Sequence, residues 1–257
     1  MTLVLFANTK GGSGKTTAAM VLAGELANHR AKVLMLEGDP NKPLLNWALG
    51  RGEPTIETSR VRAKSTEAAL AAIEKATSPV NGEGEGGRLL VVHDDEQEGV
   101  FEWIEAAEQW AHFVIADPEG SPNEWLTDVA SQADLVLVPF SPSALDAKQV
   151  ARTVQVLNRT AKRSGRPVNL RVLLTRACNI MTRDEREIRA SLEKNGLPLM
   201  TTTLRERPAY RGLFKLDATI QELSSETING LDGARRNAAE YAREVLALLH
   251  SLRAEAA

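Results

Sequence analysis

Short, uninterrupted apolar runs alternate with longer amphipathic stretches along this chain. Seven apolar runs are predicted to be strands: Leu3–Ala7, Val33–Glu37, Leu89–His93, Phe113–Asp117, Leu135–Phe140, Leu170–Thr175 and Leu199–Leu204. They are continuous rather than alternating, which is typical of strands buried on both faces of a parallel sheet. Helical patterns lie at 15–29, 66–77, 99–111, 144–164, 183–195 and 231–252. The alternation predicts an α/β fold, a doubly wound, mostly parallel sheet with helices on both faces.

Length and composition fit one soluble globular unit. The chain has 257 residues, 43% hydrophobic and 25% charged, so we expect a single domain over 1–257. Cys178 is the only cysteine, which rules out an intrachain disulfide or a multi-cysteine metal cluster and fits a reducing cytoplasm. No apolar run approaches the roughly 18 residues of a membrane span. The glycine-rich run Asn81–Gly87 predicts a surface loop.

The overall charge of -3 hides an asymmetry between the two halves of the chain. Residues 1–149 carry 12 basic and 22 acidic residues, a net charge of -10, whereas residues 150–257 carry 19 and 12, a net charge of +7. A basic half on an acidic protein indicates a polyanion partner on one face. Ordinary solvated helix faces are the alternative explanation.

A glycine-rich segment follows the first predicted strand and begins the first predicted helix. It reads Lys10-Gly11-Gly12-Ser13-Gly14-Lys15-Thr16-Thr17. Glycines let the backbone turn tightly, so that successive N–H groups face one anion, and the helix N-terminus adds partial positive charge. In such a phosphate loop the lysine before the threonines reaches the β- and γ-phosphates, and the first threonine hydroxyl binds Mg²⁺. We therefore expect ATP and Mg²⁺ as cofactors.

Lys10 departs from the usual phosphate loop, which has glycine near that position. The run K-G-G-S-G-K-T-T resembles the deviant Walker A family, which includes ParA, MinD and the nitrogenase iron protein. In that family the first lysine crosses a dimer interface to the partner's nucleotide. The resemblance therefore implies an ATPase that forms a sandwich homodimer around ATP, with Lys10 and Lys15 in catalytic roles. A cation against a γ-phosphate in a water-poor interface is stabilising far beyond a surface pair.

Two acidic positions complete the expected site. Leu36-Glu37-Gly38-Asp39-Pro40 resembles the family's D-x-D-P segment, which implies that Asp39 orients the attacking water and supports Mg²⁺. Glu37 replaces the first aspartate, and its role stays open. Phe113–Gly120 looks like the Walker B segment, in which Asp117 holds Mg²⁺ through water and the Pro-Glu-Gly turn senses the γ-phosphate. Locally, Asp39-Pro40 is also compatible with a plain turn, and Asp117 with a helix cap.

Further segments resemble ParA in particular. They are Ala133–Ser143, Val172–Arg176, Arg207–Phe214 and Ala218–Glu222. Asp39–Trp47 is also similar to VirC-type relatives that assist DNA transfer. The phosphate loop starts within ten residues of Met1, so we expect the short form without a helix-turn-helix extension. We also expect Arg207 and Pro208 to bind the nucleotide, while Tyr210 either packs in the core or stacks near adenine.

The ParA resemblance implies sequence-independent binding to duplex DNA through arginines on one face of the ATP dimer. Candidate contacts in the basic half are Arg205, Arg207, Arg211, Lys215, Arg235 and Arg236. Such contacts make log K fall with log salt, with a slope of about -0.9 per neutralised phosphate. Each of these side chains is equally compatible with a solvated or structural role.

Four functions compete at this stage. The first is a DNA-binding positioning ATPase, cytoplasmic and nucleoid-associated, with an adaptor or centromere-binding protein as partner. The second is a VirC-like accessory of conjugative DNA transfer. The third, a MinD-like membrane ATPase, is disfavoured because the C-terminal segment lacks a cationic amphipathic face. The fourth is a metabolic or redox relative, of which an iron–sulfur reductase is excluded because a cluster bridging a dimer needs two cysteines per subunit.

Overall fold

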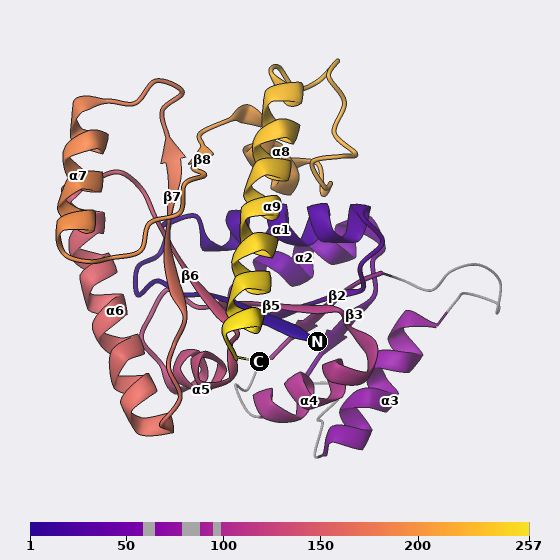
Figure 1. Ribbon diagram of the computed structural model, residues 1–257. Helices are drawn as coiled ribbons and strands as arrows, with labels where there is room; N and C mark the ends of the chain where they lie inside the picture. The colour runs from indigo at the N-terminus through magenta and orange to yellow at the C-terminus, as the bar shows by residue number, and fades with distance from the viewer. Residues whose placement is uncertain (59–64, 79–87, 95–98, 257) are drawn as a thin grey trace.

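A single parallel sheet forms the centre of the protein in a computed structural model that describes residues 1–58, 65–78, 88–94 and 99–256. Within these residues the sheet has eight strands in the order β3-β4-β2-β5-β1-β6-β7-β8 (Figure 1). The strands are β1 Thr2–Phe6, β2 Val33–Gly38, β3 Thr55–Glu57, β4 Leu89–His93, β5 Phe113–Pro118, β6 Leu135–Phe140, β7 Leu170–Ala177 and β8 Leu204–Arg205. The predicted α/β class and parallel sheet are confirmed. The predicted loop Asn81–Gly87 lies outside the described residues.

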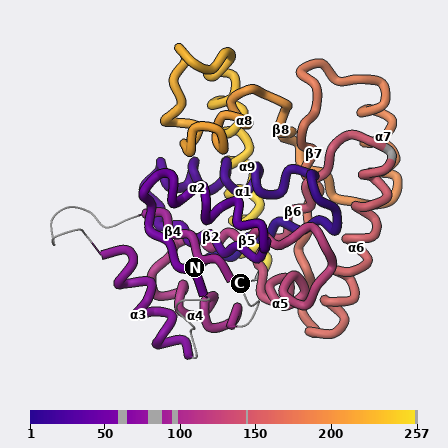
Figure 2. The backbone as a smooth tube through the Cα atoms, turned by 180° about the vertical axis from the view of Figure 1, so that it is seen from behind, coloured from indigo at the N-terminus to yellow at the C-terminus, as the bar shows by residue number. Residues whose placement is uncertain are grey.

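Helices cover both faces of the sheet (Figures 1 and 2). They are α1 Lys15–Asn28, α2 Pro43–Arg51, α3 Thr66–Thr77, α4 Val100–Trp110, α5 Glu124–Gln132, α6 Ala144–Ser164, α7 Arg183–Lys194, α8 Pro208–Lys215 and α9 Leu231–Ala256. The core is divided into two clusters, one on each face of the sheet, because successive side chains of a strand point to opposite faces. One cluster joins Val33 and Met35 to α1, α2, α8 and α9, and the other joins Leu34 and Leu36 to α3 through α7.

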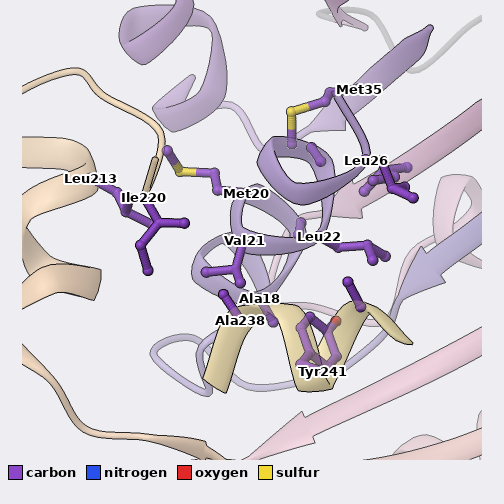
Figure 3. Packing of buried hydrophobic residues seen from close by; sticks show 14 of the residues in the cluster. Ala18, Met20, Val21, Leu22, Leu26, Met35, Leu213, Ile220, Ala238 and Tyr241 are labelled. Atoms are coloured by element: carbon purple, nitrogen blue, oxygen red, sulfur yellow. The ribbon is translucent and has the colours of Figure 1, made fainter. Parts of the chain in front are cut away.

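The last helix packs on the first. Ala238 and Tyr241 of α9 lie against Ala18, Val21 and Leu22 of α1, as Figure 3 shows. All five side chains are buried. Leu231, Tyr241, Val245 and Leu249 of α9 are thus core residues, whereas Leu246 is 40% exposed. Within the described residues no helix is long and apolar enough to cross a membrane.

The predicted strand Leu199–Leu204 is wrong for most of its length. Only Leu199 forms a bridge, to Val172, and the strand β8 begins at Leu204. The reason is a competing acceptor. The Glu244 carboxylate of α9 takes the backbone N–H groups of Thr201 at 2.7 Å and Thr202 at 2.6 Å, so these groups are not available to β7.

Three helices and one strand were missing from the sequence prediction: α2, α5, α8 and β3. The helices have only eight or nine residues each, too few to show a clear period. The strand β3 has three residues, of which only Ile56 is buried, so no apolar run marks it.

The strand order places β1 and β5 at the centre of the sheet. From β1 the chain moves toward β2, β3 and β4 on one side, and after β5 it moves to β6, β7 and β8 on the other. In open α/β sheets, ligands bind in the crevice outside the carboxyl ends of the strands at such a point of reversal. The connections that follow β1, β2 and β5 are therefore where a site is expected.

Candidate nucleotide site

The connection between β1 and α1 leaves the first turn of α1 open. Gly14 is the N-cap, with φ 88°, and Gly12 has φ 77°, a backbone region that only glycine adopts without strain. Gly14 has no side chain with which to cap this helix end, and no acidic residue lies in the first turn of α1. Because the first N–H groups of a helix have no partner within the helix, this end offers an anion site.

Long-range hydrogen bonds hold this loop in shape. Asn8 donates to the Pro139 carbonyl at 2.6 Å and accepts from the Lys10 N–H at 3.0 Å. Thr175 donates to the Ser13 carbonyl at 2.7 Å. These partners come from β6 and β7, far away in the sequence. Sequence reasoning did not identify Asn8 or Thr175, since nothing in the local motif refers to them.

Lys15 and Asp117 form the buried part of the site. Lys15 is 7% exposed, and burial lowers the pKa of its ammonium, against the opposing effect of Asp117, Asp39 and Glu119. Asp117, at the end of β5, is fully buried, and neither carboxylate oxygen has a hydrogen-bond partner among the described residues. Burial raises the pKa of Asp117 to about 7, although the nearby Thr16 hydroxyl and the Lys15 ammonium oppose this.

An unpartnered buried carboxylate is costly unless something pairs with it. Mg²⁺ fits this position, because it is bound in proteins by one or two carboxylates together with substrate phosphates. Thr16, Asp39 and Asp117 are the residues that would hold it. Within the described residues, no group of three or more His, Cys, Asp and Glu side chains could hold a metal alone, so the phosphates would have to complete the coordination.

Asp39 follows β2 in a tight turn. Its Oδ1 accepts hydrogen bonds from the backbone N–H and the side-chain amide of Asn41, both at 2.9 Å, and its carbonyl accepts from the Lys42 N–H at 3.0 Å. The turn predicted as one alternative is present, and the Asp39 charge is close enough to Lys15 to oppose the lowering of the Lys15 pKa by burial. The structure therefore gathers Lys15, Thr16, Asp39 and Asp117 at one edge of the sheet.

Glu37 anchors the segment that carries Asp39. Its buried carboxylate accepts the backbone N–H groups of Leu44 at 2.6 Å and Leu45 at 2.9 Å, and so caps α2. Burial raises the pKa of Glu37 to about 8, and the nearby charges of Asp117 and Asp39 act in the same direction. Glu37, whose role the sequence left open, thus fixes the start of α2 relative to β2 through these two hydrogen bonds.

The turn after Asp117 lies against the phosphate loop itself. A Cβ added at Gly120 would lie 2.8 Å from the Gly11 nitrogen and 3.1 Å from the Lys10 carbonyl carbon. The two loops are therefore in backbone contact, which only glycine permits at position 120. A displacement of either loop would therefore move the other loop at this contact.

Lys10 lies apart from Lys15. Its ammonium pairs with the Asp146 carboxylate in the first turn of α6. The Lys10 side chain is 38% exposed and that of Asp146 is 10% exposed, so the pair lies at the rim of the site. Ser143 caps α6 by accepting the Asp146 N–H at 3.1 Å. Lys10 thus forms an ion pair with a residue of α6 in its own chain.

A cavity of about 290 Å³ opens beside the phosphate loop, between β7, β8 and α8. Gly14 and Thr17 lie on one wall, and Arg207 and Tyr210 on the other. Tyr210 is buried and donates to the Asn237 side chain at 3.1 Å, so it packs in the core while one part lines the cavity. A larger cavity, about 920 Å³, lies between α6 and α7 and includes none of the predicted site residues.

Pro208 and the six candidate DNA contacts fall into distinct groups. Pro208 is the first residue of α8, and Arg207 caps that helix and lines the cavity. Arg205 donates to the carbonyls of Cys178 and Asn179, and Arg235 to those of Gln221 and Leu223. The exposed members are Arg211, Lys215 and Arg236. Arg205 and Arg235 thus hold the chain together, which leaves the exposed three as the stronger candidates.

Comparison with known proteins places the chain in a family. The CobQ/CobB/MinD/ParA nucleotide binding domain matches residues 4–217. Protein ParA of Rhizobium radiobacter is 30% identical over 246 residues, covering 95% of this chain and 96% of the relative. Protein virC1 of the same species is 25% identical over 214 residues, covering 83% of this chain and 80% of the relative.

The fold matches as well. A complex of a Cyanothece McdA variant with ATP superposes with a TM-score of 0.66 at 18% identity, covering 95% of this chain and 96% of that one. The open α1 N-terminus, the buried Lys15 and the unpartnered Asp117 are thus found on the fold of a protein that binds ATP. The chain belongs to the CobQ/CobB/MinD/ParA nucleotide-binding domain family, on its ParA/MinD side, whose members are P-loop ATPases.

Proposed function

We propose that this chain is a Mg²⁺-dependent, ParA-like ATPase with one catalytic domain over residues 1–257. It forms a sandwich dimer around ATP, binds duplex DNA without sequence preference, and positions DNA or a protein cargo. The observation that carries the proposal is the pairing of an open helix N-terminus with the buried Lys15 and the unpartnered Asp117. A phosphate chain and a divalent cation complement these charges.

Each residue of the proposed site has its own role in ATP binding and hydrolysis. Lys15 and the first turn of α1 bind the β- and γ-phosphates, and Asp39 orients the attacking water. Thr16 and Asp117, with support from Asp39, would hold Mg²⁺, which would supply neutralisation of the phosphate charge. The cavity of about 290 Å³ beside Gly14 and Thr17 takes the nucleoside, with Arg207 in its lining and Pro208 as the next residue along the chain.

The proposed dimer is supported by two features of the surface, the Lys10–Asp146 ion pair and exposed apolar side chains. Lys10 is held outside its own phosphate loop by Asp146, so it is free to serve another nucleotide once that pair opens. Large apolar side chains are also exposed: Leu145, beside Asp146, is 60% exposed, and Ile180, after β7, is 84% exposed. Their burial in an interface would be favourable, because it removes apolar surface from water. A second copy of this chain would cover them.

DNA binding is supported by the basic C-terminal half and by the exposed Arg211 and Lys215 of α8 and Arg236 of α9, of which Arg211 also pairs with Glu206 at 2.7 Å. Dimerisation doubles the number of such cations on one particle, so ATP raises DNA affinity without any base contact. The cargo and its adaptor protein are not identified by any of these residues.

A VirC-like role in conjugative DNA transfer is the second candidate. It is favoured by the virC1 relative, 25% identical over 214 residues, and by the similar segment Asp39–Trp47. A membrane-positioning role like that of MinD has less support, because Leu231, Tyr241, Val245 and Leu249 of α9 are used in the core. Both main candidates share the ATP dimer and DNA binding, so the tests below apply to each.

The dimer is tested by light scattering of the purified protein with ATP, ADP or no nucleotide. We expect wild type to dimerise with ATP only, Lys10→Ala to bind ATP as a monomer, and Lys15→Ala to lose ATP binding. Asp39→Ala should form a dimer that persists, because hydrolysis no longer dissolves it. Lys162→Ala, an exposed lysine in the last turn of α6 and at the far end of that helix from Leu145, is the control. Lys10→Ala that still dimerised with ATP would refute the sandwich.

A further inference from the structure

A row of three polar side chains crosses the carboxyl ends of β4, β2 and β5. In the register of the sheet, Glu37 pairs with His93 on one side and with Asp117 on the other. Side chains in register on parallel strands share one face, and the residues two positions earlier, Met35 and Val91, face α1 and α2. Glu37 and Asp117 already have roles in the site. His93, which is also fully buried, does not.

His93 contacts the turn that carries Asp39. Its Nε2 lies 3.1 Å from the Asp39 carbonyl oxygen, the same oxygen that accepts the Lys42 N–H at 3.0 Å. A carbonyl only accepts hydrogen bonds, so Nε2 carries the proton in this contact. His93 therefore fixes the peptide plane that follows the Asp39 α-carbon, from a strand outside all of the recognised ATPase motifs.

The next residue fixes the same turn from the other face of the sheet. Asp94 donates its backbone N–H to the Glu37 carbonyl at 2.9 Å, and its carboxylate accepts the Trp125 indole N–H at 2.8 Å. The Trp125 ring covers Gly38, where an added Cβ would lie 3.0 Å from the ring carbons. Gly38 and Asp39 are thus held between His93 on one side and Trp125 on the other.

We propose that His93 is a positioning residue for Asp39 in ATP hydrolysis. The proposal rests on the function proposed above, in which Asp39 orients the attacking water. Small errors in the placement of a catalytic group are costly, about 100-fold in rate for a displacement of 1 Å. Without the Nε2–H bond, the Asp39 peptide loses its donor from β4 and keeps the hydrogen bonds of its own turn. Its carboxylate then samples orientations in which the water is not aligned, while Lys15 and the phosphate loop are unchanged.

The test separates binding from hydrolysis. We would measure kcat and KM for ATP, the Kd of a non-hydrolysable ATP analogue, and the melting temperature of each variant. His93→Leu, which has no donor, should lower kcat by about tenfold or more while the analogue Kd stays near that of wild type. His93→Gln places an amide N–H near the position of Nε2 and should recover most of the rate. This recovery distinguishes positioning from simple core packing.

His93→Asn provides a second route if the leucine variant does not fold. Its shorter amide matches Nδ1 rather than Nε2, so it keeps a polar side chain without the bond to Asp39, and it should behave as His93→Leu. Wild-type kcat in a folded His93→Leu or His93→Asn variant, or equal losses of kcat, Kd and stability without recovery by glutamine, would overturn the proposal. Asp39→Ala is measured in parallel. If that variant still hydrolysed ATP at the wild-type rate, the assignment of Asp39 itself would be the one to fail.

Discussion

The Lys10 ammonium pairs with the Asp146 carboxylate, 136 residues later in the chain and in the first turn of α6. The pair joins the start of the phosphate loop to a helix on the other side of the sheet centre. It holds Lys10 within its own subunit. A Lys10 that crosses to a partner's nucleotide must first leave Asp146, so this pair competes with the proposed dimer.

Asp146→Asn should therefore favour the dimer. A part-exposed ion pair contributes roughly 0.5 kcal/mol, and two such pairs open when a dimer forms, so the dissociation constant should fall by about fivefold. Sedimentation velocity on a dilution series with a non-hydrolysable ATP analogue measures this shift. Asp184→Asn removes an exposed carboxylate from the first turn of α7 and is the control. An unchanged or weaker dimer in Asp146→Asn would show that the pair does not compete.

Asp117→Asn should stabilise the nucleotide-free protein at alkaline pH. Burial raises the pKa of Asp117 from 3.8 to about 7 in the folded state. The folded protein therefore holds this proton more tightly than the unfolded chain, and the carboxyl group lowers stability as pH rises from about 4 to about 7. The penalty is absent below this window and complete above it.

Melting temperatures of wild type and Asp117→Asn at pH 5 and pH 8 measure this effect. The advantage of the variant should be larger at pH 8, and the same variant should bind Mg·ATP more weakly because a metal ligand is lost. Asp232→Asn, an exposed carboxylate in the first turn of α9, should show no such pattern. A gap that is equal at both pH values, or larger at pH 5, contradicts the burial of a charged group here.

Removal of the exposed cations near α8 should weaken DNA binding in a salt-dependent way. The triple variant Arg211→Ala, Lys215→Ala, Arg236→Ala removes three charges per chain, or six per dimer. If all six contact phosphates, the slope of log K against log salt becomes shallower by about 5. Gel shifts on random duplex DNA with ATP, at several salt concentrations, give that slope.

The control removes the same charge elsewhere. Arg152, Arg159 and Arg163 are exposed on α6 in the same basic half of the chain, and their triple alanine variant should keep most of the slope. Equal losses from both triple variants would mean that net charge, rather than the α8 and α9 surface, determines DNA affinity. Binding that is equally strong with ADP would separate DNA affinity from the ATP dimer.

The central strands and the phosphate loop could be predicted because each is encoded locally. A continuous apolar run marks a strand buried on both faces, and three glycines before a lysine mark a phosphate loop. The family comparison agrees with that prediction over residues 4–217. The role of Glu37 could not be predicted in this way, because its partners Leu44 and Leu45 are ordinary backbone groups of a helix too short to be recognised.

The remaining parts of the site depend on contacts between distant residues. Asn8 bonds to Pro139, 131 positions away, and Thr175 bonds to Ser13, 162 positions away. The order of the strands in the sheet determines which distant residues meet, and a local sequence pattern does not specify that order. The failed strand at Leu199–Leu204 has the same cause, since Glu244 on the last helix captures its backbone donors.

The backbone contact between Gly120 and Gly11 limits what evolution can change. Every other amino acid carries a Cβ, which at position 120 would lie only 2.8 Å from the Gly11 nitrogen. Any substitution therefore forces the two loops apart. Related proteins that keep this loop geometry must therefore keep glycine at position 120. A sequence that aligns well elsewhere but lacks this glycine is expected to have lost nucleotide turnover.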